Sequence, residues 1–123
     1  MFMKHKHAGR ILGREISQRK ALFKTLLGSL VLHERITTTE AKAKEINNFI
    51  DRIINKAKAG KMAAPRRVAV IRELRNLLPE VAVKKLFGDF SARFDGRENG
   101  YARVVKIGER KSDSAKMAVI EFV

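Results

Sequence analysis

The sequence contains no cysteine and only two prolines. Without cysteine, the chain can form neither disulfide bonds nor thiolate metal sites, and it lacks the nucleophile of the cysteine enzymes. No apolar run approaches the roughly 18 residues that a helix needs to span a bilayer, and the first residues lack the apolar segment of a secretion signal. We therefore expect a soluble, cytoplasmic protein whose fold rests on noncovalent packing alone.

Acidic residues are also scarce. The 123 residues include 27 lysines and arginines but only 13 aspartates and glutamates, which gives a formal net charge of +14. Such an imbalance opposes a compact fold unless a polyanion neutralises it. The hydrophobic fraction of 45% is nevertheless ordinary for a globular protein. The charge must therefore sit on a folded body, and a nucleic acid is the first partner to consider.

Sequence motifs of enzymes are missing too. We find no glycine loop that would cradle a phosphate, no paired catalytic carboxylates and no nucleophile beside a base at a usable spacing. The chain is therefore expected not to be an enzyme and to need no cofactor or small-molecule substrate. His5 and His7, with His33 as a third ligand, could be imagined to bind zinc or copper. Because no carboxylate or cysteine accompanies the pair and nearby lysines repel a cation, contact with a phosphate or a base is favoured.

The first 24 residues carry seven basic side chains and a single acidic one. Large apolar residues are few in the first half of this stretch, so it cannot form a core element unaided. We expect residues 1–14 to be a basic extension that is ordered by RNA, and residues 15–123 to form a single globular domain. The RNA-binding candidates of the basic extension are Lys4, His5, Lys6, His7, Arg10 and Arg14.

Apolar residues spaced for one face of a helix recur over residues 17–32, which predicts an amphipathic helix. The β-branched residues that follow predict a short strand at residues 35–37. The spacing of Thr37 and Glu40 fits a capping box, in which each side chain bonds the other residue's backbone amide. A second helix should therefore begin there and end just before Gly60, which can supply its left-handed cap.

A third helix is predicted to begin at Pro65, because proline suits the first position of a helix. Pro79 should end it and begin a short fourth helix. Two β-rich runs, at residues 101–107 and 117–123, follow a turn-rich segment and predict an antiparallel hairpin. Together the elements predict an α+β fold, with about four helices packed on a small mixed sheet that includes this C-terminal hairpin.

Lysines and arginines along the whole chain can neutralise phosphates, although any single one can also be a solvated surface side chain. Beyond the basic extension, the basic candidates for RNA contact are Arg19, Lys20, Lys42, Arg66, Arg67, Arg93, Arg97 and Arg103. Thr37, Thr38 and Thr39 can offer hydroxyls and helix-terminal amides to a phosphate, or they can simply cap the helix. Tyr101 can stack on a base or ribose, or it can be half-buried on a strand. Between Tyr101 and the nearby Arg103, we favour Arg103 as the RNA contact.

The opening segment MKHKHAGRILGR, residues 3–14, resembles the start of the bacterial large-subunit ribosomal proteins of the L17 family. Further blocks resemble that family in the same order: RKAL at 19–22, RITTT with AKAKE at 35–45, KLF at 85–87, GYAR at 100–103 and MAVIEFV at 117–123. Any one block is a weak signal, but their shared order along residues 3–123 is specific.

The resemblance implies a two-layer fold, with helices packed against a small sheet. It also implies binding to large-subunit ribosomal RNA, toward the side where the nascent-chain tunnel opens, with other ribosomal proteins as neighbours. The implied role is to hold RNA segments together, and no catalytic residue is carried over.

The residues alone leave two other functions open. A DNA-binding architectural protein makes similar phosphate contacts, although the helix connections at residues 60–64 and at Pro79 give no clear recognition helix. A membrane-active cationic helix is less favoured, because several apolar stripes can cover one another and form a core.

Overall fold

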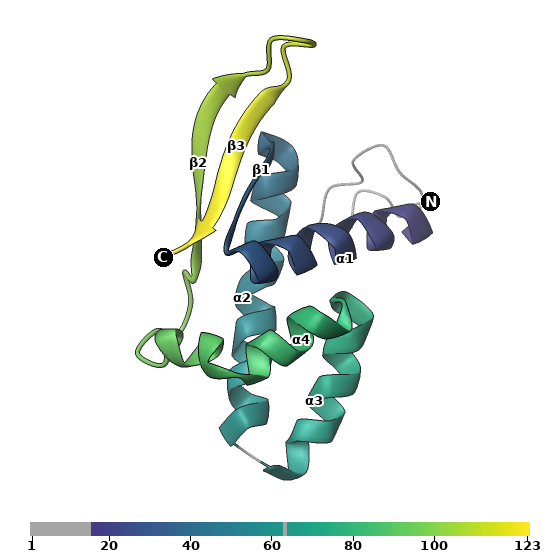
Figure 1. The fold of residues 1–123 in the computed structure, drawn as a ribbon, viewed down its shortest axis with the longest axis vertical. Helices are drawn as coiled ribbons and strands as arrows, with labels where there is room; N and C mark the ends of the chain where they lie inside the picture. Colours follow the sequence, from purple (N-terminus) through teal and green to yellow (C-terminus); the bar gives the residue numbers. More distant parts are fainter. Residues whose placement is uncertain (1–15, 63) are drawn as a thin grey trace, which may run out of the picture.

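A computed structural model describes residues 16–62 and 64–123. The first half of the chain forms α1 (Ile16–His33), β1 (Arg35–Thr39) and the long α2 (Glu40–Met62). The second half forms α3 (Ala64–Leu77), α4 (Glu80–Phe87), a 3₁₀ helix (Asp89–Phe94) and the hairpin strands β2 (Ala102–Glu109) and β3 (Lys116–Phe122), as Figure 1 shows. The predicted α+β class, the four helices and the C-terminal hairpin are confirmed.

The three strands form one sheet in the order β1-β3-β2. Both neighbouring pairs run antiparallel, so the sheet is antiparallel throughout rather than mixed. Hydrophobic patterning indicates that a strand exists but does not set its direction, which depends on pairing between residues distant in the sequence. The register places Glu121 of β3 between Arg35 of β1 and Arg103 of β2.

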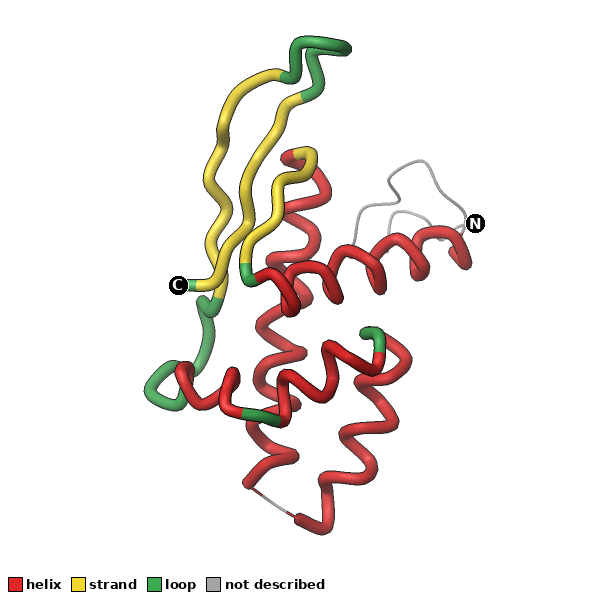
Figure 2. The backbone as a smooth tube through the Cα atoms, viewed as in Figure 1, coloured by secondary structure: helices red, strands yellow, loops and turns green. Residues whose placement is uncertain are grey.

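Helix α2 joins the sheet to the other helices. It contacts all three strands and also packs on α3 and α4, and Figure 2 shows it running from the sheet to the opposite end of the molecule. Its isoleucines Ile46, Ile50, Ile53 and Ile54 are each at most 1% exposed. Burying a side chain of this size contributes roughly 1.5 to 3 kcal/mol, so this row of isoleucines holds the two layers together.

The predicted capping box at the start of α2 is wrong. Thr37 lies within β1, opposite Val119 of β3, and α2 begins three residues later at Glu40. The β-branched threonines extend the strand because they suit a pleated backbone. The Glu40 carboxylate pairs instead with Lys44 and Lys106.

Two glycines allow the helices to approach closely. Gly60 does not cap α2, which continues to Met62; a Cβ atom on Gly60 would lie 3.1 Å from Val70 and 3.2 Å from the Phe87 ring. On Gly28 of α1, a Cβ atom would lie 2.6 Å from Cδ of Pro79. Pro79, which immediately precedes α4, therefore packs directly on the backbone of α1.

Candidate nucleic-acid interface

Ion pairs hold the arginines of the sheet. Nε and Nη2 of Arg103 donate to Oε2 of Glu121 at 2.8 and 2.6 Å, and Nε of Arg35 lies 3.5 Å from the other oxygen of the same carboxylate. The register explains this arrangement, because directly opposite residues in antiparallel strands project from the same face. Arg103, the favoured RNA contact of its segment, is therefore already bound to a carboxylate of the protein.

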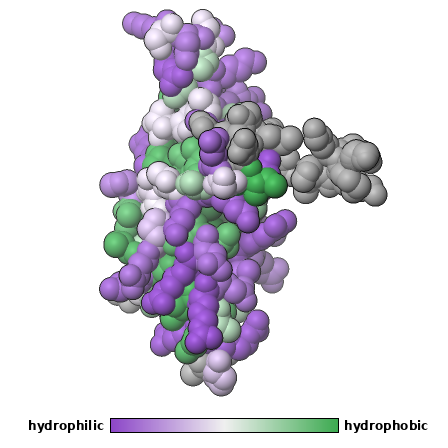
Figure 3. Space-filling view, turned by 90° about the vertical axis from the view of Figure 1, so that its right-hand side faces the viewer, coloured by the Kyte–Doolittle hydropathy of each residue, from purple (hydrophilic) through white to green (hydrophobic). Residues whose placement is uncertain are grey.

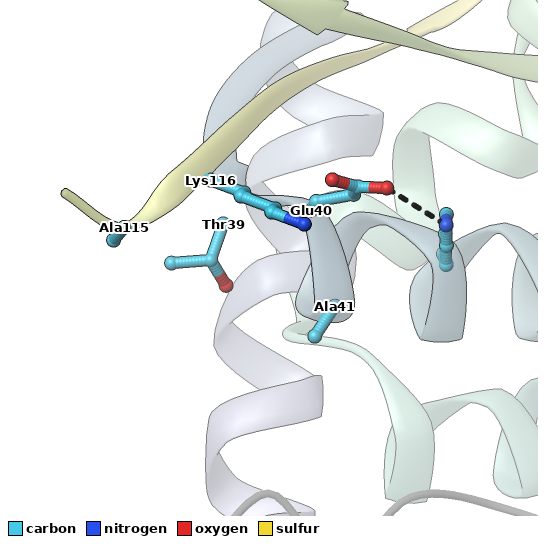
Figure 4. Close-up of a pocket in the computed structure, with 6 residues that line it drawn as sticks. Thr39, Glu40, Ala41, Ala115 and Lys116 are labelled. Atoms are coloured by element: carbon cyan, nitrogen blue, oxygen red, sulfur yellow. Dashed lines mark ion pairs between the residues drawn. The ribbon is translucent and has the colours of Figure 1, made fainter. Parts of the chain in front are cut away.

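A second carboxylate lies at the start of α2. Glu40 accepts bonds from Lys44 at 2.8 Å and Lys106 at 3.3 Å, and the pKa of Glu40 is lowered, first by the hydrogen bond from Lys44 and then by the one from Lys106. Glu40 lines a surface pocket at the start of α2. Figure 4 shows this pocket, with Glu40 beside Thr39 and with Lys116 extending into it from β3. Because a carboxylate already lies at the positive end of the helix, a phosphate at Thr39 would meet a negative charge.

A third carboxylate holds the turn after α1. Glu34 has a left-handed backbone, with φ of 65°, and its carboxylate accepts bonds from Lys85 at 3.1 Å and from Arg93. These bonds, led by the one from Lys85, lower the pKa of Glu34. The Arg93 guanidinium also lies 5.3 Å from the centroid of the Phe90 ring. Arg93, a predicted RNA contact, thus joins the 3₁₀ helix to the turn after α1.

Tyr101 is fully buried, with 0% of its surface exposed. Its hydroxyl bonds Asn55, lies 3.0 Å from the carbonyl oxygen of Arg97 and accepts a bond from Lys58 at 3.2 Å. The ring packs edge-on against Phe94 in the core. It has no free face for a base, so both the stacked and the half-buried roles predicted for Tyr101 are wrong. The Arg97 side chain is exposed and donates to the carbonyl oxygen of Gly100.

The cations of α1 and α3 contrast with those of the sheet. Within residues 16–62 and 64–123, none of the following side chains forms an ion pair with a carboxylate: Arg19, Lys20 and Lys24 of α1, and Arg66, Arg67 and Arg72 of α3. All six are exposed except Arg19, which is half-buried. Figure 3 views this side of the molecule and shows many hydrophilic side chains with apolar areas between them. We call these six residues the unpaired cations.

The remaining predicted contacts are Lys42 and the residues of the basic extension. Lys42 is half-buried near the start of α2 and forms no ion pair within the described part of the chain. The candidates of the basic extension, Lys4 to Arg14, lie outside the described residues. His33 is exposed at the end of α1, and the described residues contain no group of metal-ligating side chains around it. No helix among them is apolar over a length that could cross a membrane.

The sequence of the chain is similar to that of known proteins over most of its length. The family model described as Ribosomal protein L17 matches residues 22–123. The chain belongs to this family. It is 45% identical over 117 residues to Large ribosomal subunit protein bL17 of Shouchella clausii, a match that covers 91% of the chain and 96% of the relative. It is also 45% identical over 122 residues to the bL17 of Thermodesulfovibrio yellowstonii, with 98% and 87% covered.

Membership of the ribosomal protein L17 family confirms the resemblance seen in the sequence. A third relative, the bL17 of Staphylococcus carnosus, is 43% identical over 119 residues, which cover 93% of the chain and 98% of the relative. The members of this family are structural ribosomal proteins. Membership of the family therefore confirms the expectation of a non-enzymatic role.

Two of the unpaired cations of this L17 family member were not among the predicted contacts. Lys24 follows Lys20 by four residues, a spacing that places both on one side of a helix, so the sequence did contain a signal for it. Arg72 lies three residues before Arg75, a spacing with the same consequence. Both Lys24 and Arg72 lack an ion-paired carboxylate among the described residues, a feature that depends on residues distant in the sequence.

Proposed function

We propose that this chain is a structural constituent of the large subunit of the cytoplasmic ribosome, where it binds and stabilises folded ribosomal RNA. Kinship with large-subunit proteins supports the location. The unpaired cations of α1 and α3 carry the proposal of RNA binding. Within the described residues, none of them forms an ion pair that a phosphate would have to break, although the pKa of Glu73, lowered first by its hydrogen bond from Lys56, is lowered also by the nearby Arg66.

The paired cations are a weaker source of RNA affinity. An exposed ion pair is worth about 0.2 to 1 kcal/mol, and a cation must give up that amount before it can serve a phosphate. The basic extension, residues 1–14, is proposed to add contacts of its own and to become ordered on RNA, while residues 15–123 form the domain that presents the unpaired cations. Other large-subunit proteins are the proposed neighbours.

The test is a salt titration of binding to folded large-subunit ribosomal RNA. Replacing Arg66, Arg67 and Arg72 together with alanine should flatten the plot of log affinity against log salt by roughly 0.7 to 0.9 units per lost phosphate contact. The matched control replaces three paired arginines, Arg35, Arg103 and Arg110, and should change the slope much less. Equal slopes for the two triple variants would contradict the proposed contact surface, and equal affinity of the wild type for duplex DNA would favour the architectural DNA-binding alternative.

The basic extension is tested together with Arg19 of α1, in the full chain. Replacing Arg10, Arg14 and Arg19 with alanine should weaken RNA binding and flatten its salt dependence in the same way, because each loses a proposed phosphate contact. The melting temperature of the free protein should stay close to the wild-type value. An unchanged slope would remove these residues from the interface.

Binding toward the nascent-chain exit tunnel is also proposed. Because the sequence has no cysteine, a single cysteine introduced for Ser114, in the exposed loop between β2 and β3, would be a unique attachment point. An iron chelate on that cysteine, in assembled subunits, should cleave ribosomal RNA near the tunnel opening. Cleavage confined to RNA remote from the tunnel would contradict this placement.

A further inference from the structure

A groove opens between α1, α2 and α3, beside three of the unpaired cations. It has a volume of about 610 Å³, and its floor and walls include the rings of Phe23 and Phe49. A volume of this size is within the range of roughly 300 to 1,000 Å³ that is usual for small-molecule sites. The groove is thus large enough for one planar group and its substituents.

Two aromatic rings line the groove. Phe23 and Phe49 are half-buried, and their ring centroids lie 5.4 Å apart with the planes tilted by 44°. Both rings pack against the core, and both also border the groove. Partly exposed aromatic rings are the side chains on which unstacked bases stack in RNA-binding proteins, and the Arg52 guanidinium, 5.9 Å from the Phe49 ring centroid, adds a cation beside them.

The polar side chains of the groove are cationic or neutral. Arg19, Lys20 and Lys24 line it from α1, and the exposed amide of Asn76 lines it from α3. No carboxylate is among the described lining residues. An amide side chain can both donate to and accept from the edge of a base, and the three cations suit the phosphates on either side of it.

The charge of the groove selects among possible occupants. The chain's own residues 1–14 carry Lys4, Lys6, Arg10 and Arg14 and no acidic residue. Their positive charge is repelled by the positive charge of the groove. A second copy of the chain, with its net charge of +14, is disfavoured for the same reason. A partner must therefore be anionic and must also offer a flat apolar surface to the two rings.

We propose that this groove holds one unstacked nucleotide of the bound RNA, with its base against Phe23 and Phe49 and its neighbouring phosphates on Arg19, Lys20 and Lys24. This inference rests on the proposed RNA-binding function and adds a specific site to it. The aliphatic side chains of Ile16 and Leu77, which are 61% and 37% exposed at the groove, would be covered by the nucleotide.

The first experiment measures binding of the full chain to folded large-subunit ribosomal RNA. Phe49→Leu keeps apolar volume but removes the aromatic face, and loss of a stacked base weakens binding by roughly 5- to 150-fold. We expect a loss at the lower end of that range, with an unchanged salt slope because no phosphate contact is lost. Lys20→Ala with Lys24→Ala should instead flatten the slope.

The matched control is Phe87→Leu. Phe87 is half-buried like Phe49, and Arg67 lies over its ring as Arg52 lies over that of Phe49, but Phe87 does not line the groove. Melting temperatures of both variants show whether they fold. If Phe49→Leu binds like the wild type, or if both variants lose affinity equally, the groove proposal is overturned while RNA binding by the wild type still stands. If the wild type itself does not bind, the proposed function fails instead.

The second experiment identifies the occupant directly. Asn76→Cys on the rim of the groove, labelled with an aryl-azide maleimide, is photolysed in assembled large subunits, and the crosslinked partner is identified by mass spectrometry. A crosslink to a ribosomal RNA nucleotide supports the proposal. A crosslink only to a neighbouring protein, or only to residues 1–15 of the same chain, overturns it.

Discussion

The sheet and the α1–α3 side of this molecule use the same residue types in different ways. On the sheet, Glu121 binds both Arg35 and Arg103, and Glu40 and Asp113 bind further cations at the end where the β2–β3 hairpin turns. On α1 and α3, the unpaired cations have no such partner within the described residues. The number of lysines and arginines in a segment therefore does not tell how many of them lack an ion-pair partner; the position of the carboxylates does.

The hairpin tip contains a further ion pair on the sheet side. Nε and Nη2 of Arg110 donate to the two carboxylate oxygens of Asp113 at 2.9 and 2.7 Å. This contact and the bond from the Ala115 amide lower the pKa of Asp113 to about 2. The carboxyl thus stays charged at any physiological pH, and Arg110 is kept from other anions. The charge of Arg110 is therefore neutralised within its own loop.

The largest expected effect concerns the packing that positions the unpaired cations of α1. Gly28→Ala would place a methyl group 2.6 Å from the ring of Pro79. Overpacking of this kind costs about 1 to 3 kcal/mol, and the roughly 1 kcal/mol that alanine gains in helix propensity offsets only part of it. Thermal unfolding should show a lower melting temperature, whereas Ser29→Ala on the same helix should have little effect. A Gly28→Ala protein as stable as the wild type would mean that α1 is not held against α4.

Much of the fold could be predicted from the sequence because its signals are local. Apolar spacing predicted α1, α3 and α4 to within about two residues, and the turn-rich segment between β-rich runs predicted the hairpin. The start of α2 could not be predicted in this way. Thr37 and Glu40 have the spacing of a capping box, but backbone pairing with Val119 and its neighbours, far along the chain, makes Thr37 part of a strand.

The candidate site was less predictable because it depends on contacts between distant residues. Arg93 and its partner Glu34 are 59 residues apart, and Tyr101 is buried by contacts with α2 rather than by any pattern around it. Gly28 and Gly60 gave no signal that a neighbouring helix would lie against them. The sequence thus supplied the candidate residue types for RNA contact, while the tertiary structure determines which of them are already engaged with a carboxylate of the protein.

A smaller effect is expected from releasing the cations held by Glu34. The lowered pKa means that folded Glu34 binds a proton less readily than the unfolded chain, so its ion pairs stabilise the fold above the ordinary carboxyl pKa of 4.5. That stabilisation is lost as the pH falls through the lowered folded value. Because the Glu34 side chain is 42% exposed, solvent screens the pairs and the contribution should be about 1 kcal/mol or less.

Urea unfolding of Glu34→Gln at pH 7 and at about pH 3 measures this effect. The variant should be less stable than the wild type at the higher pH and nearly equal to it at the lower pH. Glu98→Gln removes an exposed carboxyl that forms no ion pair within residues 16–62 and 64–123, and it serves as the control. A difference for Glu34→Gln that grows on acidification would show that these ion pairs do not stabilise the fold.

The smallest effect is expected from a substitution that leaves the arginines of the sheet without their carboxylate, as the cations of α1 and α3 are. It tests the comparison between the two sides directly. Glu121→Gln keeps the shape of the side chain but removes the charge that binds Arg35 and Arg103. If carboxylates withhold cations from RNA, this variant should bind structured RNA with a steeper salt dependence, by roughly 0.7 to 0.9 units for each new phosphate contact. Glu98→Gln raises the net charge equally without releasing a cation. Equal slopes for the two variants would mean that total charge alone governs RNA binding, whereas a steeper slope for Glu121→Gln alone would show that pairing decides which cations bind.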